Sequence, residues 1–224
     1  MEQKKPIRTY VKRQGRLTKA QKNAIEIHGP SFLIEFKEEL LREEQLFLTE
    51  QPLCFEIGFG MGDATHKIAH NNPDINYIVT DVHQPGIGNL IKLSSTDNLT
   101  NIKIIPHDAL EVLQFMIKDN FLSKINIFFP DPWHKKRHNK RRLVNEDNLN
   151  LIIKKLKDGG VLHIATDWEP YALEIIDVIK TSDNLTLATN NFHERPDFRP
   201  ETKYESRKIS STSSSPSFLR LEKL

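Results

Sequence analysis

The sequence predicts an α/β protein with a mostly parallel, doubly wound sheet, and its glycine-rich turn is the first reason. An apolar run at residues 53–57 leads into three glycines at alternate positions, and residues 64–70 can then start a helix. A strand, a tight glycine turn and a helix form the first crossover of such a sheet, whose ligand crevice lies at the carboxyl ends of the strands. Glycine allows a sharp turn and lets a ligand approach main-chain atoms. The glycines are Gly58, Gly60 and Gly62.

Recurring acids are the second reason. Glu56 lies within the first apolar run, and Asp81, Asp108 and Asp131 each follow a later one. Helix capping explains a single acid after a strand, but the recurrence favours a ligand site where the strands end. The turn has the pattern E-x-G-x-G-x-G, whereas a dinucleotide fingerprint needs its third glycine where this chain has Asp63. This spacing disfavours a nicotinamide-dependent dehydrogenase.

The composition is that of a globular protein, with 224 residues of which 38% are hydrophobic and no apolar run long enough to span a membrane. We therefore expect one domain with extensions, or at most a domain plus a small lobe. The N-terminus lacks the apolar core of a signal peptide and Cys54 is the only cysteine, so we expect a cytoplasmic protein. Cys54 lies in the apolar lead-in to the glycine turn, which predicts a buried structural thiol.

The charge is unevenly distributed, although the net charge is only +2. Residues 1–22 are strongly basic and show no apolar periodicity. We interpret residues 1–30 as a basic N-terminal arm, which either binds a polyanion such as nucleic acid or is a solvated tail, and residues 31–224 as the folded domain. Residues 35–50 interleave acids with apolar side chains and predict an amphipathic helix on the edge of that domain.

The second predicted strand, residues 76–81, ends in Asp81, about 20 residues after the glycines. An acid at this place accepts hydrogen bonds from ribose hydroxyls in nucleotide-binding α/β folds. Residues 85–93 predict a helix and residues 102–106 a third strand. Asp108, which follows that strand, is placed either to meet an adenine edge or to cap the next helix.

The fourth predicted strand, residues 125–129, leads into Pro130-Asp131-Pro132-Trp133 and then into a dense cationic loop at residues 134–142. Two prolines enforce an extended, rigid turn. An acid and an indole are thereby presented at the predicted crevice, beside positive charge. We interpret this block as functional rather than as a solvated face.

The remaining chain continues the alternation of helices and strands. Residues 149–156 predict a helix that ends at Asp158-Gly159-Gly160, and residues 161–165 predict a fifth strand that ends in Thr166-Asp167-Trp168. A helix that buries its isoleucines and a strand at residues 185–189 follow. Residues 199–207 predict a loop, residues 206–217 a flexible segment with serine-rich sequence from 210 to 217, and residues 218–221 a last short strand.

Five segments, taken together and in order, resemble the bacterial tRNA (guanine-N7)-methyltransferases, which modify a guanine in the variable loop of tRNA. They are residues 56–62, 82–88, 129–135, 166–168 and 202–205, and residues 13–18 of the arm are similar as well. The resemblance runs from about residue 8 to Arg207, and the Pro-Asp-Pro-Trp-His-Lys block is its most diagnostic part. It implies a Rossmann-like class I methyltransferase fold, with a mostly parallel seven-stranded sheet and helices on both faces.

The resemblance also implies a role for each matching residue, with Asp131 as the catalytic acid. The residues implied to bind S-adenosylmethionine are Glu56, Gly58, Gly60, Gly62, Asp81, Asp108, Ala109 and Asp131. Those implied to bind the tRNA substrate are Arg13, Lys135, Asp167, Thr202, Lys203, Tyr204 and Glu205. We expect no metal and no membrane partner, and a monomer or weak homodimer.

The residues are chemically suited to this reaction. Guanine N7 is a lone-pair acceptor without a proton, so attack on a sulfonium methyl needs no general base. A carboxylate such as Asp131 can accept hydrogen bonds from the guanine N1–H and N2–H groups. Trp133 and Tyr204 are candidates to stack on an extruded base, and Arg13 and the loop at 135–142 are candidates to bind phosphates.

Two alternatives stay open. An amino methyltransferase, acting on an exocyclic nitrogen of another nucleic acid or of a protein, would carry Asn/Asp-Pro-Pro-Tyr/Trp after the fourth strand, and Asp131-Pro132-Trp133 lacks the second proline. A diverged tRNA-binding paralogue without activity is the other, because Asp81 stands where the family usually has glutamate and residues 208–217 replace a glycine-rich segment. The intact glycines and strand-end acids argue against it.

Overall fold

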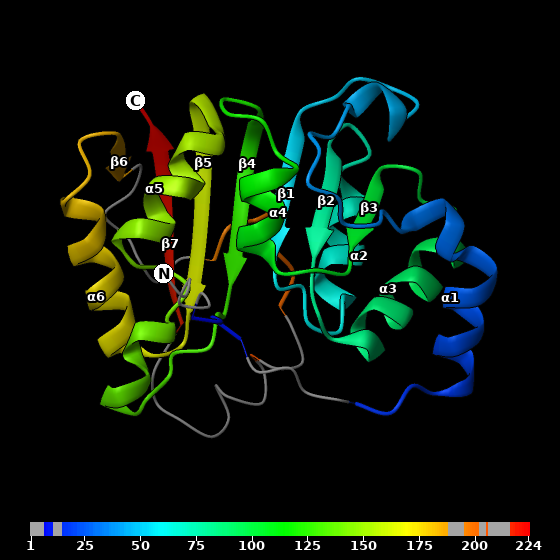
Figure 1. Ribbon diagram of the computed structural model, residues 1–224, viewed down its shortest axis with the longest axis horizontal. Helices are drawn as coiled ribbons and strands as arrows, with labels where there is room; N and C mark the ends of the chain where they lie inside the picture. Colours follow the sequence, from blue (N-terminus) through cyan, green and yellow to red (C-terminus); the bar gives the residue numbers. More distant parts are fainter. Residues whose placement is uncertain (1–6, 11–14, 188–194, 202–204, 206–215) are drawn as a thin grey trace, which may run out of the picture.

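The computed structural model describes residues 7–10, 15–187, 195–201, 205 and 216–224, and it contains a seven-stranded sheet in the order β3-β2-β1-β4-β5-β7-β6. Neighbouring strands are parallel except β7, which runs antiparallel to both β5 and β6. The predicted Rossmann-like, mostly parallel seven-stranded fold is confirmed (Figure 1). The strands are β1 (Leu53–Ile57), β2 (Asn76–Thr80), β3 (Ile102–Ile105), β4 (Leu122–Phe128), β5 (Leu156–Thr166), β6 (Leu185–Leu187) and β7 (Ser217–Lys223).

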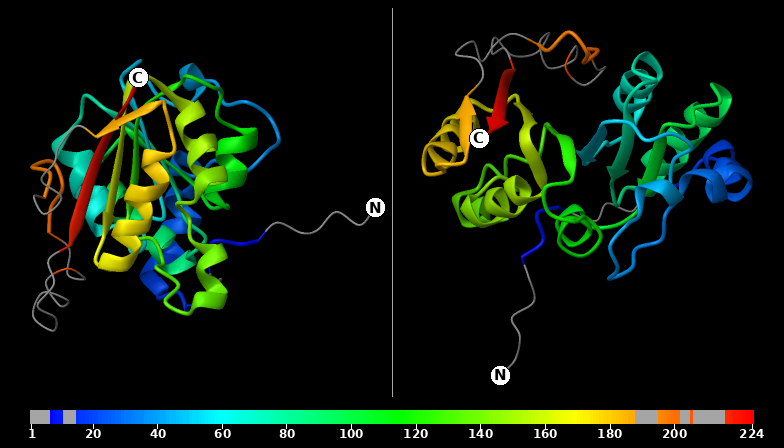
Figure 2. Two further views of the ribbon diagram at one scale, coloured as in Figure 1. Left: turned by 90° about the vertical axis from the view of Figure 1, so that its left-hand side faces the viewer. Right: turned by 90° about the horizontal axis from the view of Figure 1, so that it is seen from above.

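Helices cover both faces of this sheet (Figures 1 and 2). One apolar core joins α4, α5 and α6 to the sheet, and a second core on the opposite face joins α1, α2 and α3 to β1, β2 and β3. Every residue of β1 and β2 is buried, as expected of central parallel strands covered on both sides. The helices are α1 (Lys19–Phe32), α2 (Asp63–Asn71), α3 (Gln84–Thr96), α4 (Ala109–Phe115), α5 (Glu146–Lys155) and α6 (Glu169–Lys180), with short 3-10 helices η1 (Glu43–Gln45) and η2 (Lys136–Arg141).

The basic N-terminal region contributes a helix to the fold, which its sequence pattern did not indicate to us. Thr18 and Gln21 form a capping box at the start of α1, and that Thr-x-x-Gln spacing is a recognised start signal. Helix α1 packs on α3 and adds Ala24 and Phe32 to the second core. Residue 30, where we expected the arm to meet the domain, lies inside this helix.

Residues 35–50 do not form the amphipathic helix expected of them. Apart from η1 they are an irregular connection. Phe36 stacks on His107 with ring centroids 3.7 Å apart, and the Leu41 N–H donates to the Met116 carbonyl at 2.8 Å. The apolar side chains are thus fixed at separate places near α4, and these long-range contacts override the helical spacing of the segment.

The boundary between α5 and β5 also differs from expectation. The predicted helix was to end at Asp158-Gly159-Gly160, but α5 ends at Lys155 and β5 begins at Leu156. Leu122 on β4 pairs with Leu156, whereas Lys124 pairs with Val161, so the pairing contains an irregularity that accommodates the glycines. Leu156 therefore joins the core from a strand. The glycines interrupt the strand pairing and do not terminate the helix.

The glycine turn and the start of α3 touch each other closely. Gly58, Gly60 and Gly62 all have positive φ angles, between 60° and 79°, a region that glycine enters without steric cost. A Cβ atom built on Gly86 in α3 would lie 1.7 Å from the Gly60 carbonyl oxygen. Because Gly86 has no side chain, the start of α3 can pack directly against the backbone of the glycine turn.

We predict that Gly86→Ala destabilises the fold, because the methyl group meets backbone rather than a movable side chain. The loss should be about 1–3 kcal/mol or more, the usual range for overpacking a tight contact, and thermal or urea unfolding measures it. Gly29→Ala in α1 is the matched control, since its Cβ would meet only the end of Leu33, at 3.2 Å. Equal stability of the two variants would contradict this role of Gly86.

Candidate functional site

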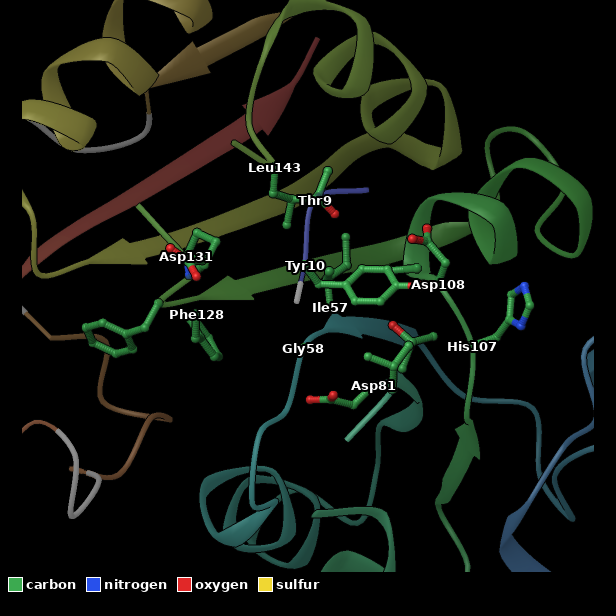
Figure 3. Close-up of a pocket in the computed structure, with 15 residues that line it drawn as sticks. Thr9, Tyr10, Ile57, Gly58, Asp81, His107, Asp108, Phe128, Asp131 and Leu143 are labelled. Carbon is green, nitrogen blue, oxygen red and sulfur yellow. The ribbon is translucent and has the colours of Figure 1, made fainter. Parts of the chain in front are cut away.

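A crevice of about 250 Å³ lies at the carboxyl ends of β1, β2, β3 and β4 (Figure 3). Three of the strand-end acids line it, together with the backbone of the first glycine. Two residues of the N-terminal segment complete the wall. The lining residues with polar or aromatic side chains include Thr9, Tyr10, Asp81, His107, Asp108, Phe128 and Asp131.

The glycine turn and Asp81 form one wall of the crevice. The Gly60 N–H donates to Asp81 Oδ2 at 2.7 Å, and the His83 N–H donates to Asp81 Oδ1 at 2.9 Å. Burial raises the pKa of Asp81, and these backbone donors act in the opposite direction. A Cβ atom on Gly58 or on Gly60 would point into open space. The backbone of the turn is therefore accessible to a ligand, which a side chain at Gly58 would obstruct.

Glu56 lies beneath the turn, in β1, and is 3% exposed. Its Oε1 accepts a hydrogen bond from the Thr65 hydroxyl at 2.9 Å, while its Oε2 is buried and has no hydrogen-bond partner among the described residues. Burial raises the pKa of Glu56 to about 7, against the effects of the Thr65 hydroxyl and the Arg199 charge. A buried carboxylate oxygen without a donor is costly, so this atom is suited to a cationic or N–H group of a ligand.

Asp108 does both things considered for it. It caps α4, because Oδ1 accepts from the N–H groups of Leu110 at 2.8 Å and Glu111 at 3.3 Å, and it lines the crevice next to Ala109. The Tyr10 ring lies close to it across the crevice (Figure 3). Burial and the neighbouring Asp108 raise the pKa of Tyr10.

Asp131 stands in a strained corner that follows β4. Phe129 has φ 52° and Trp133 has φ 46°, and bulky residues rarely adopt this left-handed conformation. Between them Asp131 is exposed, and its Oδ1 accepts from the Trp133 N–H at 2.9 Å. The second carboxylate oxygen makes no hydrogen bond within the described part of the chain. It is therefore available to a ligand in the crevice.

Arg142 fixes this corner from behind, although the sequence placed it in the cationic loop. Its side chain is buried, its Nε donates to the Pro132 carbonyl at 2.9 Å, and its guanidinium lies over the Tyr171 ring. A close ion pair with Glu174 attaches it to α6. Arg142 is thus a buried cation that stabilises the corner, unlike the exposed cations of η2.

Arg199 supports the corner from the other side. Its guanidinium packs on the rings of Phe128 and Phe129, with centroid distances of 4.8 and 5.0 Å. Both oxygens of Glu205 accept from its Nη1, at 2.7 and 2.8 Å. Glu205, which was predicted to bind substrate, is 1% exposed and forms this buried ion pair. The sequence contained no signal for the pairing beyond the presence of both residues in one loop.

Trp133 does not have the place expected of a base-stacking residue. It is only 8% exposed, Arg141 lies over its ring at 5.0 Å, and its Nε1 donates to the Thr9 carbonyl at 3.2 Å. Arg141 covers the ring, and the ring N–H is bound to the main chain of Thr9. The ring is therefore not available to a base, and the stacking prediction is wrong. Trp133 instead ties the N-terminal segment at Thr9 and Tyr10 to the corner that holds Asp131.

The predicted tRNA-binding cations gather on η2, beside the corner. The side chains of Lys135, Lys136, Arg137 and Lys140 are exposed.

Asp167 is half-buried at the end of β5, next to Trp168, which is 38% exposed and meets His134 edge to face at 4.5 Å. The remaining predicted substrate residues, Arg13, Thr202, Lys203 and Tyr204, lie outside the described residues, as does the serine stretch from 210 to 215.

The sequence and the fold of the chain are similar to those of known proteins. A family model described as "Putative methyltransferase" matches residues 50–215. A tRNA (guanine-N(7)-)-methyltransferase of Chromobacterium violaceum is 48% identical over 206 residues, which cover 92% of this chain and 91% of that protein. One from Francisella philomiragia is 43% identical and covers 90% of this chain and 88% of its own. The chain belongs to the tRNA (guanine-N7)-methyltransferase family.

Solved structures of low sequence identity share the fold. The 16S rRNA methyltransferase KamB has a TM-score of 0.59 at 14% identity, with 83% of this chain and 94% of that chain covered. A putative methyltransferase from Streptococcus mutans in complex with SAH has a TM-score of 0.53 at 12% identity, with 83% and 99% covered. Within the described residues, no helix has the length and apolar character needed to cross a membrane, and no group of three or more His, Cys, Asp or Glu side chains is arranged to hold a metal ion.

We predict that Glu56→Gln stabilises the protein without ligand at pH 8 and has little effect at pH 5. The folded pKa of about 7 lies above the unfolded value, so the folded state holds more protons between about pH 4.5 and 7 and its stability falls across that range. The full difference is on the order of 3 kcal/mol. Thermal unfolding at both pH values measures it, with Glu39→Gln in an exposed connection as control. A gain that is equal at pH 5 and pH 8 would rule out this titration.

Proposed function

We propose that the protein transfers a methyl group from S-adenosylmethionine to N7 of a guanine in tRNA, in the variable loop. The observation that carries the proposal is the strained corner, which sets Asp131 at the edge of the glycine-lined crevice and beside the cations of η2. Family membership gives the reaction class, and the relatives' names give the substrate. A monomer or weak homodimer in the cytoplasm, as expected from the sequence, is part of the same proposal.

Four features of this chain fit the crevice to S-adenosylmethionine. The open space above Gly58 and Gly60 leaves room for a ligand against the backbone. The orphaned Oε2 of Glu56 is suited to an ammonium group, and Asp81, at the end of β2, is placed for ribose hydroxyls. Asp108 and Ala109 line the side where an adenine would lie. The cofactor would supply an electrophilic methyl group on a cationic sulfur.

The chain's own task is to position the guanine and stabilise its charge. N7 carries a lone pair and no proton, so no residue needs to act as a base. The free oxygen of Asp131 would accept from the guanine N1–H and N2–H groups and would oppose the positive charge that develops on the ring. Positioning alone can be worth about 7–11 kcal/mol of a barrier. The rigidity of the corner serves this role.

Trp168 is a better candidate than Trp133 to stack on the extruded base. It is exposed, it lies next to Asp167 at the carboxyl end of β5, and no arginine of the described residues covers its face as Arg141 covers that of Trp133. Aromatic side chains commonly hold single bases of RNA by stacking. The edge contact with His134 would orient the ring beside the Asp131 corner.

The reaction is tested by incubating the protein with unmodified tRNA and S-adenosylmethionine and mapping methylated nucleotides by mass spectrometry. We expect 7-methylguanine, and Asp131→Asn should lower single-turnover transfer about 10²–10³-fold, the scale for one preorganised electrostatic group. The amide oxygen still accepts from the Trp133 N–H, but its NH₂ faces the guanine donors. A methylated exocyclic nitrogen would instead support the amino methyltransferase. A variant within a few-fold of the parent would remove Asp131 from the mechanism.

The cations of η2 should bind the RNA backbone. Replacing Lys136, Arg137 and Lys140 together with alanine should weaken tRNA binding and reduce its log–log salt slope by about 2, since each phosphate contact contributes roughly 0.7. Arg141 is kept because it packs on Trp133. The control replaces Lys154, Lys157 and Lys180, three exposed lysines elsewhere. An unchanged slope in the η2 variant would identify these residues as a solvated surface.

A further inference from the structure

A second cavity lies on the same face of the sheet as α1, α2 and α3, over strands that these helices do not cover. It has a volume of about 490 Å³ and lies between β4, β5 and β7 on one side and residues 195–198 on the other. In both views of Figure 2 the segment at 195–201 lies across β7 from α6, on the opposite side of the sheet. We call it the basic cavity, after Lys124, Arg195 and Arg220, which line it with His163 and Phe198.

Strand pairing brings these residues together from distant parts of the sequence. Asn126 on β4 pairs with His163 on β5, and His163 pairs with Arg220 on β7. The three residues therefore point from the same face of the sheet in one row. Lys124 lies two residues before Asn126 on the same face, with its Nζ over the Phe198 ring at 4.5 Å. The Phe198 ring in turn stacks on His163 at 5.0 Å.

The charges of the basic cavity are unbalanced. Lys124 and Arg220 form no ion pair within the described part of the chain, whereas Arg195 faces Glu201 at 3.5 Å and Glu205 at 3.7 Å. Asp197 is the acid that lines the cavity. Among the described residues, two cations without an ion pair thus line a hollow with one exposed carboxylate, an arrangement that favours an anionic ligand.

His163 is the second observation that indicates a ligand. It is 5% exposed, and neither ring nitrogen has a hydrogen-bond partner among the described residues. Burial, with Lys124 and Arg220 nearby, lowers its pKa to about 3, so the ring is neutral and offers one N–H donor. A buried donor without an acceptor is costly, and an anionic oxygen in the cavity would satisfy it.

The basic cavity is a neighbour of the catalytic crevice. Phe128 lines both cavities, and the corner that holds Asp131 begins at the next residue. An RNA strand that delivers a guanine to Asp131 would therefore pass close to Lys124 and Arg220.

We propose that the basic cavity binds a backbone phosphate of the substrate RNA, through Lys124, Arg220 and the His163 N–H, while a guanine occupies the crevice. The proposal rests on the proposed function. It assigns RNA contact to side chains of β4, β5 and β7, in addition to the cations of η2 predicted from the sequence. The ligand chemistry is a phosphate diester of a polynucleotide.

The test measures tRNA affinity over a salt series for Lys124→Ala/Arg220→Ala, with Lys154→Ala/Lys180→Ala on α5 and α6 as charge-matched control. We expect about tenfold weaker binding and a salt slope reduced by about 0.7, the contribution of one phosphate, with the control like the parent. His163→Phe keeps the stacked ring and should weaken binding without changing the slope. Binding of the double variant that equals that of the control would overturn the proposal.

Two further measurements distinguish an RNA phosphate from a free anion, and RNA binding in this cavity from methyl transfer in the crevice. Inorganic phosphate at constant ionic strength should not raise the melting temperature of the parent more than that of the double variant, and a rise specific to the parent, with tRNA affinity unchanged, would assign the cavity to a free anion instead. Single-turnover transfer at subsaturating tRNA should fall in the double variant in proportion to its weaker tRNA binding. A parent that binds tRNA through this cavity but transfers no methyl group would refute the proposed function while supporting this site.

Discussion

The candidate site depends on one backbone feature, the left-handed corner from Phe129 to Trp133. Each bulky residue in this conformation costs on the order of 1–3 kcal/mol and persists only where its surroundings determine it. Here the Phe129 N–H donates to the Ala165 carbonyl at 2.8 Å, which joins the corner to β5. Arg142 holds the Pro132 carbonyl and Asp131 holds the Trp133 N–H. The position of Asp131 is therefore fixed by the contacts that join the corner to the sheet and to Arg142, and they leave the corner little flexibility.

This constraint divides the cations of the chain into two groups. Arg142 and Arg199 are buried, each lies over aromatic rings, and each is paired with a glutamate. They stabilise the corner and have no surface left for RNA. The cations of η2 and of the basic cavity carry the charge that is left for the proposed phosphate contacts. A charge count along the sequence treats both groups alike, which explains why Arg142 was placed with the loop predicted to bind phosphates.

Local patterns in the sequence predicted the elements that hold the crevice. The strand at 53–57, the alternate glycines and the strand-end acids are short-range signals, and the structure places Asp81, Asp108 and Asp131 around one crevice as expected. Cys54 is buried, as its apolar surroundings indicated. These predictions succeed because β1 and the turn are determined by burial on both faces and by positive φ angles, which the residue types report directly.

Several of the failures involve partners far away in the chain. Trp133 donates to the carbonyl of Thr9, 124 residues earlier, so its burial cannot be read from its neighbours. Residues 35–50 follow contacts with α4 rather than their own periodicity. The row of Asn126, His163 and Arg220 exists only once β7 inserts antiparallel beside β5. Predicting such a site requires the order of the strands in the sheet, which local sequence patterns do not contain.

The way in which the crevice acids are held has a consequence for binding RNA. Asp81, Asp108 and Asp131 accept hydrogen bonds from the backbone N–H groups of Gly60, His83, Leu110, Glu111 and Trp133. Backbone donors satisfy carboxylate oxygens without adding a formal positive charge. No lysine or arginine among the described residues forms an ion pair with these three acids. These acids are therefore not neutralised by neighbouring cations, which suits the cationic sulfur and methylated purine of the proposed function, and the cations around the crevice stay available to a polyanion that the acids alone would repel.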